Sequence, residues 1–296
     1  MTFGDYLLHL FYLVDSELEA MNLPRLRGRG PDTKLHDSEV LTMELAGEFI
    51  GLDQDKAIYR HFRRYHLREF PALAHVHRTN FVRQAANLWR VKQLLHERLL
   101  AHIRLHEGPL WLIDSFPLHV CKFARAKSSK LFKGLAAFGY DHLVRNTFFG
   151  FRIHVRCSDE GPLAPAGLTA ADVHDLVAVE TVLPAEGGVG VGDRNYWGAD
   201  KAADLLRRGF LLLAPYRTKA KDPNPQKSAV LRRARRLVET VIGQLADRFH
   251  CKRTWARDLW HLCNRLARKF LSHTAAVLLN LRAGNPPLQL ALLIDD

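Results

Sequence analysis

The chain of 296 residues is long enough for one large domain or two smaller ones, and its 47% hydrophobic and 25% charged residues are typical of a soluble globular protein. The early apolar run from Tyr6 to Val14 lacks the basic flank and cleavage site of a signal peptide, and no segment reaches the roughly 20 apolar residues of a membrane span, so we expect a cytoplasmic protein. The net charge of +12 favours a polyanionic partner.

Residues 1–108 are predicted to form an all-helical N-terminal domain. Apolar residues recur there at four-residue spacing, as at Leu41, Leu45 and Phe49, which is typical of one face of an amphipathic helix. Core packing within one protomer is the simplest explanation of such a stripe. The expected helices span Asp37 or Ser38 to Ile50, residues 55–65, and residues 79–105.

The periodicity changes after Pro109, and residues 109–296 are predicted to form an α/β domain. Short apolar runs of strand length alternate there with segments of helical period, which is the pattern of a sheet covered by helices. Strands are expected at residues 110–113, 147–157, 163–168, 189–193 and 210–213, and helices at residues 172–183, 197–208, 228–249 and 255–281.

The positive charge is concentrated in two segments. Residues 1–109 carry 15 Lys/Arg against 14 Asp/Glu, whereas residues 214–270 carry 15 against four and residues 119–156 carry eight against one. Segments of a single sign attract a polyanion, and their binding to phosphates releases counterions. Because a solubilising surface usually mixes both signs, this distribution favours nucleic acid as the partner.

Three acidic residues from distant segments are candidates for a metal site. Asp114 and Asp193 come at the ends of predicted strands, and sites of open parallel sheets form beyond the carboxyl ends of the strands. Glu239 lies on the long basic helix that is expected at residues 228–249. Three carboxylates suit a pair of Mg²⁺ ions about 3.5 to 4 Å apart, which is an arrangement for phosphodiester chemistry. We therefore predict that the three carboxylates converge in the fold.

Each of these acids also has a plain structural explanation. An Asp after a strand is often a turn or helix-cap residue. Glu239 lies four residues after Arg235, a spacing at which an ordinary surface ion pair contributes about 0.2 to 0.5 kcal/mol. His174 and Asp175 form an auxiliary candidate pair that either orients water or DNA at the metal site or caps a helix.

Three motifs resemble those of the DDE transposases of bacterial insertion sequences, whose catalytic core has a ribonuclease-H-like fold. The motifs are Leu112-Ile-Asp-Ser115, Gly192-Asp-Arg-Asn-Tyr196 and Arg235-Arg-Leu-Val-Glu239-Thr. The resemblance covers roughly residues 109–282 and includes the order and approximate spacing of the three acids. It implies a ribonuclease-H-like mixed sheet flanked by helices and preceded by the all-helical domain.

The resemblance also implies a function. A protein of this kind cuts the ends of an insertion sequence and joins the freed 3′-OH to target DNA, with two Mg²⁺ ions, or Mn²⁺ as a substitute, held by Asp114, Asp193 and Glu239. Residues 1–108 would bind the terminal inverted repeats, mediate dimerisation, or both, and residues 109–296 would catalyse the reaction. We expect a nucleoid-associated homodimer on DNA with no membrane partner. The residues expected to hold the phosphate backbone are Arg232, Arg233, Arg235, Arg236, Arg248, Lys252 and Arg253.

Two alternatives stay open at this point. The first is a ribonuclease-H-like nuclease that hydrolyses DNA without strand transfer, and a joining assay that depends on a 3′-OH separates it from a transposase. The second is a non-catalytic DNA-binding protein, which includes a decayed transposase copy. The three intact acids argue against decay.

Overall fold

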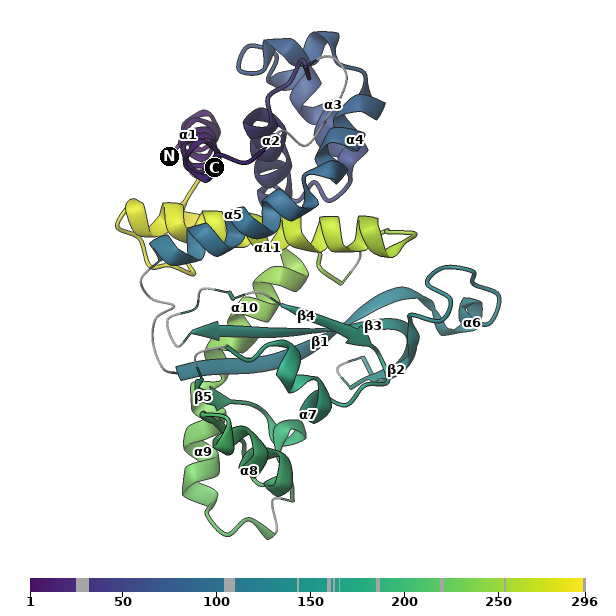
Figure 1. Ribbon diagram of the computed structural model, residues 1–296, viewed down its shortest axis with the longest axis vertical. Coiled ribbons are helices and arrows are strands. Elements are labelled where there is room, and N and C mark those ends of the chain that lie inside the picture. The colour runs from purple at the N-terminus through teal and green to yellow at the C-terminus, as the bar shows by residue number, and fades with distance from the viewer. Residues whose placement is uncertain are drawn as a thin grey trace. The chain divides into compact units, whose positions relative to one another are not determined.

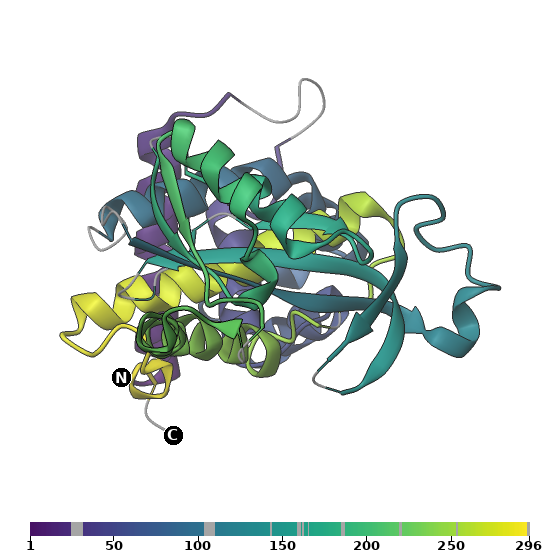
Figure 2. The same ribbon diagram turned by 90° about the horizontal axis from the view of Figure 1, so that it is seen from below.

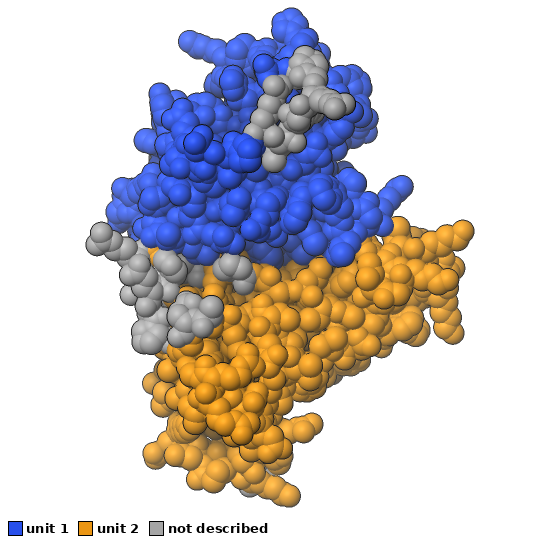
Figure 3. Space-filling model, viewed as in Figure 1, with its two compact units in different colours: residues 1–102, 245–296 blue, residues 103–244 orange. Residues whose placement is uncertain are grey.

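Two compact units make up the chain, as the computed structural model shows (Figure 3). Residues 1–102 and 245–296 form the first, called the helical unit, and residues 103–244 form the second, called the sheet unit. Residues 245–296 thus fold with the N-terminal helices, although the sequence places them in the α/β domain. The expected division of function between residues 1–108 and 109–296 stays a prediction. The structure describes residues 1–24, 32–103, 110–142, 144–158, 161, 163–164, 166–184, 187–218, 221–252 and 254–294.

The helical unit is built around the long helix α11 (Leu259–Arg282), which packs against α5 and α2 (Figure 1). Leu41, Leu45 and Phe49 are buried, so this stripe serves core packing. The expected helix at residues 79–105 is two helices, α4 and α5. In the described part of the chain, no helix has the length and apolar character to cross a membrane. The further helices of this unit are α1 (Phe3–Met21), α2 (Asp37–Phe49), α3 (Asp55–Tyr65), α4 (Arg78–Asn87) and α5 (Trp89–His102).

A network of buried charged side chains joins the helices of this unit. Arg268 of α11 contacts Glu48 of α2 at 2.6 Å and Glu44 at 3.2 Å. Lys269 contacts Glu48 at 2.7 Å, and Lys92 of α5 contacts Glu44 at 2.6 Å. All five side chains are essentially inaccessible to solvent. Each buried charge therefore depends on its partners, because an unpaired ion in the interior is strongly unfavourable.

Asp55 at the start of α3 extends this network. Burial alone would raise the pKa of Asp55, but Arg268 and Arg265 lower it to about 2. The cations Arg265, Arg268 and Lys269 of the basic segment thus neutralise acids from the first 109 residues. These three cations are bound inside the helical unit and add little to an external field, so the net charge of residues 214–270 overstates what this segment offers to a polyanion.

The sheet unit contains a mixed sheet with the strand order β2-β3-β1-β5-β6, and β4 also pairs with β3 (Figures 1 and 2). β1 pairs antiparallel with β3 and parallel with β5, and β5 pairs parallel with β6. The ribonuclease-H-like mixed sheet that the sequence predicts is confirmed. The strands are β1 (Leu110–Lys122), β2 (Ala137–Asp141), β3 (Asn146–Ser158), β4 (Gly167–Ala170), β5 (Gly188–Val191) and β6 (Phe210–Leu213).

The two faces of β1 serve different purposes. Trp111 and Ile113 join a buried apolar cluster that includes Leu205 of α8 and Phe210 of β6. Because successive residues of a strand point to opposite faces, Asp114 lies on the other face. The helices of this unit are α6 (Phe123–Ala126), α7 (Asp175–Ala178), α8 (Ala199–Arg207), α9 (Pro225–Ala234) and α10 (Arg236–Asp247), the last of which continues into the helical unit.

Within residues 109–296, four expected elements differ clearly from the structure. β1 continues to Lys122, so Asp114 lies inside a strand and not after its end, because antiparallel pairing with β3 extends well past the parallel pairing with β5. The expected strand at residues 163–168 is a single bridge at Leu163 followed by β4. The expected helix at residues 172–183 is the short α7 and a 3-10 turn, and the expected helix at residues 228–249 breaks at Arg235 into α9 and α10.

Glu48→Ala is expected to destabilise the helical unit by about 3 to 5 kcal/mol, because Arg268 and Lys269 would stay buried without this carboxylate. Urea unfolding followed by far-UV circular dichroism measures the loss. The matched control is Glu180→Ala, since Glu180 also binds two cations, Lys201 and Arg208, but on the surface, where solvent screens the pairs. An equal loss in both variants would contradict the role assigned to burial.

Candidate active site

Two aspartates lie level with each other where the parallel part of the sheet ends. β1 and β5 run parallel, and their last paired residues are Leu112 and Val191. Asp114 and Asp193 each follow two residues later, so the register carries both to the same end of this strand pair. The structure therefore brings together two of the three acids that the sequence singles out.

Asp193 begins a tight turn. Its Oδ1 accepts a hydrogen bond from the N–H of Asn195 at 2.8 Å and caps the 3-10 helix Arg194–Tyr196. Gly192 precedes it because a Cβ at this position would lie 2.6 Å from the ring of Tyr196. Asp193 is thus a capping residue, as the plain structural explanation predicts. A cap made by Oδ1 does not exclude a metal bond made by Oδ2, so both roles are compatible.

Asp114 is held by an arginine that comes from the junction of α9 and α10. Arg235 donates a hydrogen bond from Nη2 to Oδ2 of Asp114 at 2.5 Å, and the N–H of Ser115 donates to Oδ1 at 2.8 Å. Burial raises the pKa of Asp114 to about 6, Arg235 opposes this rise, and the charge of Asp193 adds to it. The pKa of Asp193 is also raised, first by burial, and the charge of Asp175 adds to this rise. Negative charge is therefore costly at this place, and a cation would stabilise it.

Asp175 at the start of α7 is the centre of a polar cluster. This cluster contacts β1 through Ser115, on the face opposite to that of Asp114. Ser115 donates from Oγ to Oδ1 of Asp175 at 2.6 Å, and Asn195 donates from Nδ2 to Oδ2 at 3.3 Å. Arg152 of β3 donates to Oγ of Ser115 at 3.2 Å and lies 3.8 Å from Asp175, and His154 lies 3.7 Å from it. These contacts fix the buried carboxylate of Asp175 near Asp193.

The histidines beside Asp175 have different environments. Burial lowers the pKa of His154 to about 4 against the opposing charge of Asp175, so its ring is neutral at pH 7 and bonds to Thr169 at 2.8 Å. His174 is exposed, and its Nδ1 accepts a hydrogen bond from the N–H of Leu176 at 3.2 Å, which caps α7. In the pair predicted from the sequence, His174 is thus a helix cap and Asp175 is a neighbour of the acidic site.

The hydroxyl of Tyr196 is buried close enough to Asp114, Asp175 and Asp193 for their charges to act on it. Within the described residues it has no hydrogen-bond partner. Burial raises the pKa of Tyr196 well above its usual value, and the charges of Asp175 and Asp114 raise it further. Tyr196 is therefore a neutral wall of the site that packs on Gly192.

Glu239 lies on α10, one helical turn after Arg235. Its N–H donates to the carbonyl of Arg235 at 3.3 Å, and residues four apart share one face of a helix. Arg235 reaches Asp114 from this face, but the side chain of Glu239 is exposed. The structure thus places Glu239 on the helix face from which Arg235 reaches the site, and it shows no contact of Glu239 with the two aspartates among the described residues.

The acidic pair has the chemistry of a magnesium site, although it is incomplete. Nowhere in the described ranges do three or more His, Cys, Asp or Glu side chains form a group that could hold a metal ion. Asp114 and Asp193 offer carboxylate oxygens, which are the ligands that Mg²⁺ prefers. Their raised pKa values reflect buried negative charge that a divalent cation would stabilise. The pair fits such a cation, and the third ligand stays a prediction.

The basic residues of α9 and α10 divide into two groups. Arg232, Arg233 and Arg236 are exposed. Arg235 is directed to Asp114 instead, and solvent reaches little of its side chain. The three exposed arginines are therefore available for a phosphate backbone, whereas Arg235 belongs to the acidic site.

The other basic residues predicted to hold DNA lie in the helical unit. Arg248 lies over the ring of Phe49, with its guanidinium carbon 4.6 Å from the ring centroid. Lys252 is half-buried, and Arg253 lies outside the described residues. Arg248 thus serves packing in the helical unit as well as any contact with phosphate.

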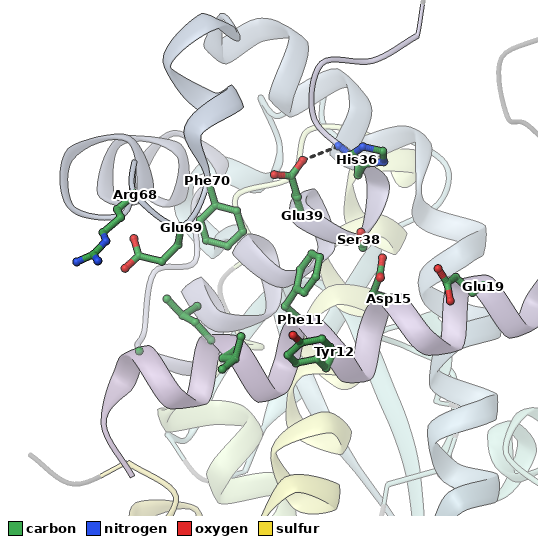
Figure 4. A pocket seen from close by; sticks show the side chains of 13 residues that line it. Phe11, Tyr12, Asp15, Glu19, His36, Ser38, Glu39, Arg68, Glu69 and Phe70 are labelled. Atoms are coloured by element: carbon green, nitrogen blue, oxygen red, sulfur yellow. Dashed lines mark hydrogen bonds between the residues drawn. The ribbon is translucent and has the colours of Figure 1, made fainter.

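A separate groove of about 1010 Å³ lies between helices of the helical unit (Figure 4). Apolar side chains such as Phe11 and Tyr12 line it together with carboxylates, one of which, Glu39, accepts a hydrogen bond from the N–H of His36 at 2.7 Å. Because these carboxylates would repel phosphates, this groove is an unfavourable place for the DNA-end binding expected of residues 1–108. The four carboxylates are Asp15, Glu19, Glu39 and Glu69.

Several residues of the site have contacts that the sequence does not predict. Ser115, Asn195 and Tyr196 lie inside the motifs, but no role follows from their types alone. Arg152 and His154 carry a signal, because they alternate with apolar residues and so place polar groups on one face of a central strand. Buried polar groups require partners, so this alternation indicates a polar cluster on that face.

Comparison with known families agrees with this geometry. The family described as "Transposase DDE domain" matches residues 106–259, which is slightly more than half of the chain. The match includes both aspartates, Glu239, and the whole described sheet. The chain matches no curated protein and no solved structure.

Tyr196→Phe is expected to leave the free energy of unfolding unchanged or slightly higher, because the buried hydroxyl that it removes has no hydrogen-bond partner among the described residues. Gly192→Ala is expected to cost about 1 to 3 kcal/mol, because its Cβ would press on the Tyr196 ring. Urea unfolding measures both changes. The control is Tyr59→Phe, which removes a hydrogen bond to the carbonyl of Val76 and is expected to cost about 1 kcal/mol. A loss in Tyr196→Phe as large as in this control would mean that the hydroxyl has a partner.

Proposed function

Because this chain belongs to the transposase DDE domain family, we propose that it cuts the ends of an insertion sequence and joins the freed 3′-OH to target DNA. The observation that carries this proposal is the level placement of Asp114 and Asp193 at the end of the parallel strand pair. Family membership implies a DNA substrate, and the exposed arginines of α9 and α10 supply positive charge in the same unit as the two aspartates.

Asp114, Asp193 and Glu239 form the proposed metal-binding set. Two Mg²⁺ ions, for which Mn²⁺ can substitute, would activate the attacking oxygen and stabilise the leaving oxygen of the phosphodiester. Asp114 and Asp193 supply carboxylates from adjacent strands, and Glu239 supplies one from the helix face that already reaches Asp114 through Arg235. Asp175 is a positioning residue in this scheme, since it fixes Asn195, whose N–H binds Asp193.

No side chain acts as a nucleophile in this proposal. Water attacks first and frees a 3′-OH, and this hydroxyl then attacks target DNA, so the chain forms no covalent bond to the substrate. The neutral hydroxyl of Tyr196 and the buried Asp175 are therefore parts of the site's wall and support.

The active species in this proposal is a homodimer on DNA in the bacterial nucleoid. Joining two element ends to one target requires two acidic sites, and each chain supplies one pair of level aspartates. A chain of net charge +12 repels its own copies in free solution, and the phosphates of the element's inverted repeats and of the target offset this repulsion.

Asp114→Asn, Asp193→Asn and Glu239→Gln are each expected to lower metal-dependent cleavage of the element's own ends by at least about 100-fold, because each removes a ligand from a site that stabilises several kcal/mol of charge. Binding to the same DNA should persist, since removing an anion does not weaken attraction to phosphate. The control is Asp204→Asn, which removes a partly exposed carboxylate of α8 in the same unit.

The same reactions separate the alternatives. Cleavage without 3′-OH-dependent joining would identify a nuclease, and DNA binding without any cleavage by the unchanged chain would identify a non-catalytic protein. Full activity of Glu239→Gln would remove Glu239 from the metal set and leave the aspartate pair.

Replacing Arg232, Arg233 and Arg236 by Gln is expected to weaken binding to all DNA sequences alike, because these exposed side chains present charge and no base-reading geometry. The slope of the logarithm of the binding constant against the logarithm of salt concentration should flatten by about 0.9 for each phosphate that the variant no longer neutralises. Fluorescence anisotropy over a salt series measures both effects. Selective loss of affinity for the element's end would instead indicate that these arginines read bases.

A further inference from the structure

A strongly basic arm projects from the sheet at the far end of β1 (Figures 1 and 2). It consists of residues 122–140, which are the last residue of β1, the short helix α6, a loop and most of β2. Five cations and no acid occur in this stretch, and all five side chains are exposed. The arm therefore presents a local field of one sign. The cations are Lys122, Arg125, Lys127, Lys130 and Lys133.

Aromatic rings are exposed on the same arm. Phe138 and Tyr140 alternate on β2, so they point to one face of the strand, and they are 43% and 44% exposed. Gly139 between them faces the other way and packs closely on Ala171. Phe123 of α6 is 50% exposed, and its ring centroid lies 5.6 Å from that of Phe138. The ring of Phe138 also packs on Phe149 of β3, with the centroids 5.2 Å apart, so the folded chain covers one face of β2 closely and leaves the aromatic face partly exposed.

The spacing of these rings suits nucleic-acid bases. Two residues apart on a strand means a separation of roughly 6.6 to 6.8 Å along the strand. Successive bases of a DNA strand are stacked roughly 3.4 Å apart, so two rings at twice this spacing leave room for one base between them. Aromatic rings bind bases by stacking, without regard to sequence, when cations beside them hold the phosphates.

We propose that the basic arm binds unpaired DNA, with bases stacked on Phe138 and Tyr140 and phosphates held by the five cations. Unpaired bases are required because in a duplex the faces of the bases are already stacked on one another. This inference rests on the proposed function only in taking DNA as the substrate, and it adds that part of this substrate is single-stranded at the arm.

Other occupants fit the arm less well. A second copy of this chain carries the same net charge of +12 and would be repelled by the cations. A surface of anionic lipids would satisfy the charges but has no bases to stack on the exposed rings. DNA is the polyanion that the rest of the sheet unit already favours.

The test compares fluorescein-labelled single-stranded DNA of about 16 nucleotides with a duplex of the same sequence, by anisotropy of the full chain in metal-free buffer. The double variant Phe138→Ala, Tyr140→Ala is expected to lose roughly tenfold to hundredfold or more in affinity for the single strand, since stacking contributes about 1 to 3 kcal/mol per base. Its affinity for the duplex should stay within about twofold. Lys130→Gln with Lys133→Gln should weaken both complexes and flatten their salt dependence.

Two controls make the result specific. Tyr12→Ala removes a ring of the helical unit that is more exposed, at 64%, than either ring of the arm and should change neither affinity. Phe138→Trp keeps a stacking ring, so it should retain single-strand affinity, and its fluorescence should be quenched by the single strand and not by the duplex. Unchanged single-strand affinity in the alanine variant, an equal loss in Tyr12→Ala, or arm-dependent binding to anionic vesicles in place of DNA would each overturn the proposal.

This test is independent of the proposed catalysis. Because no metal is present and no bond is cut, failure of the arm to bind single strands leaves the carboxylate variants and their cleavage assay untouched. A chain that binds single strands through the arm but never cuts DNA would instead contradict the transposase proposal and support the proposal for the arm.

Discussion

Parallel pairing of β1 with β5 is the constraint on which the acidic site depends. The pairing ends at Leu112 and Val191, and Asp114 and Asp193 each follow two residues later, Asp114 within β1 and Asp193 just after the end of β5. Two carboxylates placed so close repel each other, and burial increases the cost. The structure offsets this cost with Arg235, and the break between α9 and α10 occurs at this residue. The register of β1 and β5 thus brings two negative charges together, and the arginine that offsets them lies at the break between α9 and α10.

Some cations of the chain are bound to buried acids and others are exposed, and the composition does not reveal this difference. In the helical unit, cations of α11 are bound to Glu44, Glu48 and Asp55 in a largely buried network, and the described groove of this unit is lined by carboxylates. In the sheet unit, the arginines of α9 and α10 and the lysines of the basic arm are exposed. The sheet unit, which holds the acidic pair, therefore also presents exposed cations to phosphate, and the helical unit has exposed arginines of its own, such as Arg60 and Arg78.

Sequence reasoning predicts the elements of the fold better than the contacts of the site. Short apolar runs identify β5 and β6, and the position of the aspartates relative to these runs predicts that Asp114 and Asp193 meet. The length of β1 is not predictable, because polar residues beyond Ile113 are kept in the strand by pairing with β3. The contact of Arg235 with Asp114, 121 residues away, is likewise revealed by no local pattern.

The strand β1 also sets a distance between the two proposed DNA contacts. Asp114 and Lys122 are eight residues apart on one strand, which corresponds to roughly 26 Å of extended chain. Duplex DNA rises roughly 3.4 Å per base pair, so this length equals about eight base pairs. A strand whose scissile phosphate lies at the acidic pair would therefore meet the basic arm about three quarters of a duplex turn away. Because a single strand of the sheet joins both contacts, this separation is fixed by backbone geometry and does not depend on the placement of the helical unit.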